Sequence, residues 1–295
     1  GDQIWIPAMQ DSATAFKIYV EEVQAGTRKP HADLKIDGGR VQVSGALGVM
    51  EINGILCRMI FDHNNYKHTF YVEESYVIKW MYPYMTPHGL ILKINREPTP
   101  FKPSSDTACN DLDFWDWYTR RMHSNPKFLR DVVARKSFSK LRSAIGGLYA
   151  NRGQFANAER AFQESRILYP LSPEANFRLT QEILLRRNRF DESRWLMTEY
   201  ARKDPGNKRV PDFLAYIDNI KALRDKIVEL EGKHKQGKFD ANTAIQLAEL
   251  YRQAGQKGTM GRYIESVLSI SNLPPQFAYQ AATILHKGKK YAEMA

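Results

Sequence analysis

The chain has 295 residues, of which 43% are apolar, and a formal net charge of +10 at neutral pH. This content is enough for a sizeable core and for two domains, but no stretch approaches the roughly 18 uncharged apolar residues of a membrane span. Two cysteines, Cys57 and Cys109, are too few for a disulfide framework, and whether they pair stays open.

Residues 1–96 predict a small α/β domain. A helix capped by Asp11 and Ser12 should extend to residue 24, and a hairpin should follow at residues 34–43, around an Asp-Gly-Gly turn. A second helix is expected over residues 47–61, and strands are expected at 69–72 and 89–94. The N-terminus has no signal-peptide pattern and begins with Gly rather than Met, so we expect a piece of a longer protein.

Residues 97–111 are rich in proline and lack apolar periodicity, which predicts a linker. Helices should resume at residue 112 with a bulky aromatic turn, and a further helix should run over residues 126–135 behind Pro126. From residue 138 onward everything is expected to be helical. The predicted boundaries are therefore 1–96 for the α/β domain, 97–111 for the linker and 112–295 for a helical-repeat domain.

Two similar segments, 138–170 and 173–205, lie about 35 residues apart, a period typical of stacked helical hairpins. A long amphipathic helix is expected over residues 213–233, and then a third hairpin. The residues expected to pack the repeats are Gly146, Tyr149, Ala158, Phe162 and Pro170 in the first copy, Phe190, Ser193 and Pro205 in the second, and Leu247, Ala248 and Tyr251 in the third.

These segments resemble the tetratricopeptide repeat, which has glycine and tyrosine in its first helix and alanine, an aromatic residue and proline in its second. The second copy has Thr180 or Gln181 where glycine is expected, and the third has Met260 at a small-residue position. The resemblance implies a concave groove, lined by first helices, that binds a peptide or subunit. Residues placed to face such a groove are Asn176, Arg178, Gln246 and Glu249.

A second resemblance lies between residues 39 and 98, in the motifs Phe-Tyr-Val-Glu-Glu-Ser, Trp-Met-Tyr-Pro-Tyr, Pro-His-Gly-Leu-Ile and Lys-Ile-Asn. They are similar to the extracytoplasmic part of a bacterial membrane-protein family related to the protein O-mannosyltransferases. That family places a GT-C-like glycosyltransferase body before an α/β segment and tetratricopeptide-like repeats. The membrane body is not in this sequence, so no catalytic residue is assigned.

Other candidate sites are weaker. The segment Ser44–Gly48 lacks the lysine of a nucleotide loop and is interpreted as a tight turn. His63, His68, His88 and the pair Glu73–Glu74 have no compact metal-ligand spacing, so we expect no metal or other cofactor. An aromatic ligand patch would consist of Trp80, Tyr82, Tyr84 and His88. The favoured alternative is that this segment plugs the seam between the two domains, opposite Trp115 and Trp117.

Basic residues cluster between Arg120 and Arg142 and again at residues 186–189. Such clusters are most often solvated helix faces. Contact with an anionic membrane surface is the next interpretation, whereas no recognition motif accompanies them, so nucleic acid is not expected.

The sequence therefore predicts an α+β protein: a small α/β domain followed by an all-α, tetratricopeptide-like array. We expect a non-catalytic protein-interaction region, on the extracytoplasmic side and tethered by a membrane region. The alternative is a free-standing, cytoplasmic repeat protein that binds peptides or subunits. The oligomeric state is not predicted.

Overall fold

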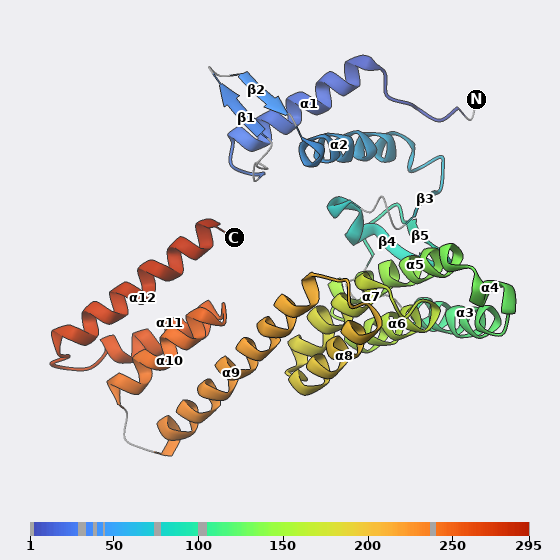
Figure 1. Cartoon of the computed structure of the whole chain (residues 1–295). Helices are drawn as coiled ribbons and strands as arrows, with labels where there is room; N and C mark the ends of the chain where they lie inside the picture. The colour runs from blue at the N-terminus through green and yellow to red at the C-terminus, as the bar shows by residue number, and fades with distance from the viewer. Residues whose placement is uncertain are drawn as a thin grey trace. The chain divides into compact units, whose positions relative to one another are not determined.

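The computed structural model describes residues 3–28, 34–37, 40–43, 45–73, 78–99, 105–236 and 240–294. By its internal contacts the chain forms two compact units, Gly1–Ile183 and Leu184–Ala295. Helices predominate, and the first unit contains a small three-stranded antiparallel sheet, which confirms the α+β class (Figure 1). Within the described ranges, no helix is both long and apolar enough to cross a bilayer.

Two helices and a hairpin begin the first unit. Helix α1 (Met9–Gln24) packs against α2 (Ala46–Asn64), and β1 (Leu34–Asp37) pairs antiparallel with β2 (Arg40–Val43). The N–H of Ala8 donates to the Asp11 carboxylate at 2.7 Å, which fixes the start of α1. These elements confirm the two predicted helices and the predicted hairpin, but α1 begins at Met9, so Asp11 and Ser12 lie in its first turns and not at its cap.

The sheet has the order β3-β5-β4, with β3 at Phe70–Val72, β4 at Met85–His88 and β5 at Ile91–Ile94. Strands β3 and β5 confirm the predicted strands. The sequence did not predict β4, because Pro87 argues against a strand; proline is tolerated here since β4 is an edge strand. The aromatic segment before it forms a short 3₁₀-helix, η2 (Lys79–Tyr84).

The predicted linker is too long, because α3 (Ser105–His123) begins within it. The buried face of α3 runs back from Trp115 through Asp111 to Ala108. Because Asp111 is charged, it interrupts the apolar periodicity by which this part of the helix would have been predicted. Residues 100–104 of the predicted linker lie outside the described residues.

The predicted helix over 126–135 is in fact two helices, α4 (Pro126–Arg130) and α5 (Val132–Asn151). Asp131 separates them, and its carboxylate accepts the N–H of Ala134 at 2.9 Å, which caps α5. Helix α6 (Phe155–Leu168) packs closely along α5.

The helical run expected over residues 173–187 is irregular. It begins as α7 (Pro173–Arg178), continues as the π-helix η3 (Leu179–Leu184) and ends as the 3₁₀-helix η4 (Leu185–Arg187). The Thr180 hydroxyl donates to the Asn176 carbonyl at 2.9 Å.

The second unit continues with α8 (Phe190–Lys203), α9 (Arg209–Gln236), α10 (Ala241–Gln253), α11 (Lys257–Leu268) and α12 (Pro275–Met294). Helix α9 confirms the prediction of one long helix and extends it at both ends.

One turn recurs between helices at three places in the described part of the chain. Its central residue has a left-handed backbone at Gly153, Asn188 and Gly255, with φ values of 67°, 58° and 71°. The following N–H bonds back five residues in each case: Gln154 to Tyr149, Arg189 to Leu184 and Gln256 to Tyr251, all at 2.9 Å. This hydrogen bond ends each preceding helix by the same capping geometry.

Candidate functional site

The repeat-packing residues of the first unit lie where α5 and α6 touch. A Cβ atom built on Gly146 would stand only 2.9 Å from the Phe162 ring, and Phe162, Tyr149 and Ala158 are fully buried. Only glycine therefore lets the two helix backbones approach this closely. Pro170 follows α6, and its carbonyl accepts a hydrogen bond from the Asn176 amide.

Corresponding positions follow the other two turns. Nine residues after Tyr149, Leu184 and Tyr251, the chain places Ala158, Ser193 and Met260, all buried. In the second unit, Ser193 donates to the Arg189 carbonyl at 2.8 Å, Phe190 is buried at the start of α8, and Pro205 is exposed in the turn after it.

The last three helices of the second unit pack through a continuous apolar core. Leu247, Ala248 and Tyr251 of α10 belong to it, together with side chains of α9, α11 and α12. This core fixes the spacing of α9, α10 and α12.

A groove of about 680 Å³ lies over these three helices. Its lining is largely apolar, and α11 contributes none of it. The lining residues are Lys226, Glu229 and Leu230 of α9, Ile245, Gln246, Glu249 and Leu250 of α10, and Tyr279, Gln280, Thr283, Ile284 and Lys287 of α12. Tyr279 is 75% exposed although it borders an apolar surface.

The charges around the groove are unevenly satisfied. Glu249 pairs with Arg252 at 2.6 Å, and this hydrogen bond lowers the pKa of Glu249. Glu229 pairs with Lys233 at 2.6 Å, which lowers its pKa likewise. Both carboxylates pair with cations outside the lining, and Lys287 also attracts Glu249 electrostatically. Lys226 and Lys287 are exposed, and neither forms an ion pair within the described part of the chain. The groove therefore offers an apolar floor between two exposed ammonium groups, of which Lys287 lies close enough to the Glu249 carboxylate to interact with it.

The four residues expected to face a groove separate into two pairs. Gln246 and Glu249 line the groove of the second unit. Asn176 instead lies in the interior at 1% exposure, where it bonds the carbonyls of Pro170 and Ser172. Arg178 pairs with Glu182 at 2.7 Å and its guanidinium lies 5.3 Å from the Phe162 ring centroid. These two side chains stabilise the first unit, because their polar groups are used internally.

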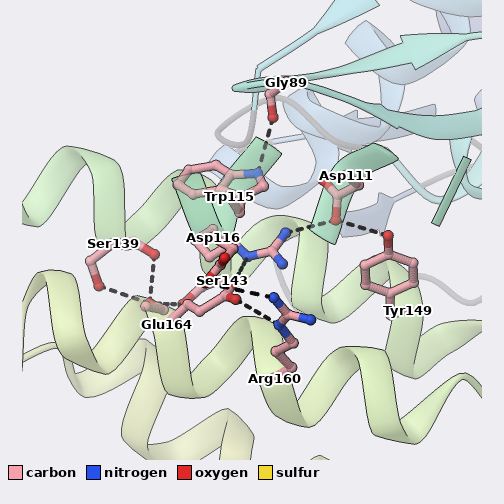
Figure 2. A network of polar contacts seen from close by, with 11 residues as sticks. Gly89, Asp111, Trp115, Asp116, Ser139, Ser143, Tyr149, Arg160 and Glu164 are labelled. Carbon is pink, nitrogen blue, oxygen red and sulfur yellow. Dashed lines mark hydrogen bonds and ion pairs between the residues drawn. The ribbon is translucent and has the colours of Figure 1, made fainter. Parts of the chain in front are cut away.

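A buried polar network joins α3, α5 and α6 (Figure 2). Arg142, fully buried, donates to Asp111 at 2.8 Å and to Glu164 at 2.7 Å, and the Tyr149 hydroxyl donates to Asp111 at 2.8 Å. Burial raises the pKa of Tyr149, and the Asp111 carboxylate raises it further. Since two carboxylates surround one guanidinium and a neutral hydroxyl, the network specifies how the three helices meet.

The aromatic candidates do not form one patch. Trp80 and Tyr84 lie against α2: the Trp80 N–H donates to the Gly54 carbonyl at 3.0 Å, and the Arg58 guanidinium lies 4.9 Å from the Tyr84 ring centroid. The carbonyl of Tyr82 accepts from Arg152 of α5 at 3.0 Å. His88 lies on the edge strand with its ring 5.1 Å from that of Tyr71.

The sheet and the helices of the first unit meet at a seam. Buried Trp115 donates its N–H to the Gly89 carbonyl at 3.1 Å, and Arg152 bonds the Tyr82 and Met85 carbonyls. Trp117, expected in the seam, is 52% exposed, because it lies two residues from Trp115 and so points to another side of α3.

The remaining candidate residues, which are histidines, glutamates, a turn and two cysteines, do not form a site within the described residues. The His63 ring stacks on Trp5 at 4.2 Å. Within the described residues, no three His, Cys, Asp or Glu side chains gather as metal ligands would; Glu74 lies outside those residues. Gly45 precedes the first turn of α2, and Ser44 is not described. Cys57 and Cys109 are free thiols, and burial raises the pKa of Cys57.

Sequence reasoning did not identify Lys226, Tyr279 or Lys287 as groove residues. They belong to α9 and α12, and nothing in a local pattern says that these helices flank α10. In comparisons with known proteins, the chain matches no protein-family model and no curated protein.

Proposed function

We propose that this chain is a non-catalytic protein-interaction region that binds a peptide segment in the groove over α9, α10 and α12. The observation that carries the proposal is the groove itself: an apolar floor of about 680 Å³ between Lys226 and Lys287. Pockets of this volume with a mostly apolar surface are typical ligand sites. The occupant that fits is a segment with an apolar anchor residue flanked by carboxylates.

The repeated helix turn supports this proposal. Repeat proteins that stack helical hairpins align the first helices of the hairpins on one side, and they bind partners on such surfaces. Helices α10 and α12, which precede and follow α11 in the sequence, would be the first helices of two successive hairpins. Both line the groove.

The test is a random-peptide display selection on the whole chain, followed by fluorescence titration of the selected peptides. We expect apolar residues flanked by Asp or Glu. Tyr279→Ala should weaken binding about tenfold or more, as loss of a central aromatic contact does, and Lys287→Glu should weaken acidic peptides further. Tyr66→Ala is the matched control, since Tyr66 is 72% exposed against 75% for Tyr279 and lies in the other unit. If the selected peptides bound Tyr279→Ala and the wild type equally, the groove would not be their binding site.

The cellular setting is a separate proposal, which rests on the resemblance of residues 39–98. In it, the chain is the extracytoplasmic part of a GT-C-like glycosyltransferase and presents acceptor proteins to the membrane body; the alternative is a free-standing cytoplasmic scaffold. The full-length gene distinguishes them, because only the first requires many apolar spans upstream of residue 2.

A further inference from the structure

The junction of α4 and α5 combines exposed apolar side chains with exposed cations. Val133 is 74% exposed, Val132 48% and Leu129 38%. Lys127, Arg130 and Lys136 are exposed around them. These six residues are called the basic corner.

The corner is held rigidly by what lies beneath it. Phe128 is buried, and its ring lies 5.9 Å from that of Phe138. Asp131 caps α5 through the Ala134 N–H. These contacts position the backbone so that the side chains of Val132 and Val133 are exposed. Lys136 lies on the same face of α5, because it follows the two valines by four and three residues.

The cations of the corner outnumber the one carboxylate among them, Asp131. The Arg130 Nε donates to the Pro126 carbonyl at 3.1 Å, and the Lys136 ammonium lies 5.7 Å from the Tyr169 ring centroid. No ion pair joins Lys127, Arg130 or Lys136 to an acidic side chain in the part of the chain that the structure describes. Between residues 117 and 140, Asp131 is the sole carboxylate among the cations Arg120, Arg121, Lys127, Arg130, Arg135, Lys136 and Lys140.

We propose that the basic corner binds the surface of an anionic lipid bilayer. Cations attract acidic headgroups, while aliphatic side chains among them enter the boundary between headgroups and acyl chains. Nucleic acid would account for the charge but not for Leu129, Val132 and Val133, because single strands bind through stacked aromatic rings. This proposal does not depend on the peptide groove, which belongs to the other unit.

The experiment is co-sedimentation of the whole chain with vesicles of phosphatidylcholine alone or with about 30% phosphatidylserine added. We expect binding to the anionic vesicles only, weakened by salt. The triple variant Lys127→Gln, Arg130→Gln, Lys136→Gln should bind about 100-fold more weakly, since each cation near an anionic surface contributes about fivefold. Val132→Ser with Val133→Ser should bind about tenfold more weakly at unchanged charge.

The matched control removes three exposed lysines of the second unit, Lys203→Gln, Lys208→Gln and Lys257→Gln, which gives the same net charge. It should keep wild-type vesicle binding. All substituted side chains are exposed, so circular dichroism and melting should match wild type in every variant. Equal loss in the control and corner triples would overturn the proposal in favour of unspecific charge. Binding of a labelled oligonucleotide without vesicle binding would overturn it in favour of nucleic acid, and an unaffected double-serine variant would remove the apolar contribution on which it rests.

Discussion

Replacing Gly146 by alanine tests whether α5 and α6 touch at this position. The added Cβ would lie 2.9, 3.0 and 3.2 Å from the Cε1, Cδ1 and Cζ atoms of Phe162. Carbon atoms normally pack at about 3.5–4.0 Å, so the ring must retreat by roughly 0.5–1 Å. Phe162 is fully buried, and the Arg178 guanidinium lies 5.3 Å from its ring centroid. The ring therefore has little room to move.

Two opposing effects set the magnitude. Overpacking a core costs about 1–3 kcal/mol, whereas glycine to alanine inside a helix stabilises by about 1 kcal/mol. We expect Gly146→Ala to destabilise the first unit by up to about 2 kcal/mol. The control is Gly261→Ala in α11, where nothing lies within 4 Å of the added carbon. It should stabilise the second unit by about 0.5–1 kcal/mol, because only helix propensity changes.

The assay is urea denaturation followed by circular dichroism, with each variant compared on the transition of its own unit, because a chain of two units need not unfold in one step. The difference between the two variants removes helix propensity and leaves the steric cost. Adding Phe162→Leu to Gly146→Ala should recover part of that cost, a positive coupling between neighbours. If Gly146→Ala stabilised its unit as much as Gly261→Ala does, the close contact between α5 and α6 would not exist.

Two further predictions concern buried hydroxyl groups. Tyr149→Phe removes a hydrogen bond to Asp111 and leaves a buried carboxylate with fewer donors, so the first unit should lose about 1–3 kcal/mol in urea denaturation. An unchanged midpoint would show that this hydrogen bond does not stabilise the unit. Burial and the Glu231 carboxylate raise the pKa of Tyr251 to about 12, from an ordinary value of 10.0. The native state then keeps a proton that the unfolded state loses, so stability is fully present below pH 10 and falls as the pH rises towards 12. Thermal melting of Tyr251→Phe should depend less on pH across this window, and equal slopes in both proteins would contradict the assigned environment.

Local patterns predicted most of the helices and two strands of the sheet. The apolar periodicity of α9 and the hairpin of β1 and β2 are decided by neighbouring residues, and both predictions are confirmed. The predictions were wrong where a residue distant in the sequence determines the local structure. Asp111 extends the buried face of α3 only because, from α5, Arg142 neutralises it and Tyr149 donates a hydrogen bond to it. Pro87 fits a strand only because that strand is at the edge.

The candidate groove was predictable in part. Gln246 and Glu249 were identified from their place in a repeat, and both line the groove. Asn176 has a similar place, but the carbonyls of Pro170 and Ser172 bond its amide in the interior. Whether a polar side chain faces solvent or caps a neighbouring turn depends on tertiary contacts that spacing does not encode.

The seam between the sheet and the helices means that the chain cannot be divided at residue 111 without breaking buried contacts. A fragment beginning at Leu112 would lack Asp111, so Arg142 would keep a single acidic neighbour in a water-free interior, and Trp115 would lose the Gly89 carbonyl that receives its indole proton. Recombination that transplanted only the helices after residue 111 would therefore yield an unstable product. The first 183 residues are therefore better regarded as one folding unit than as a small domain joined to a separate repeat array.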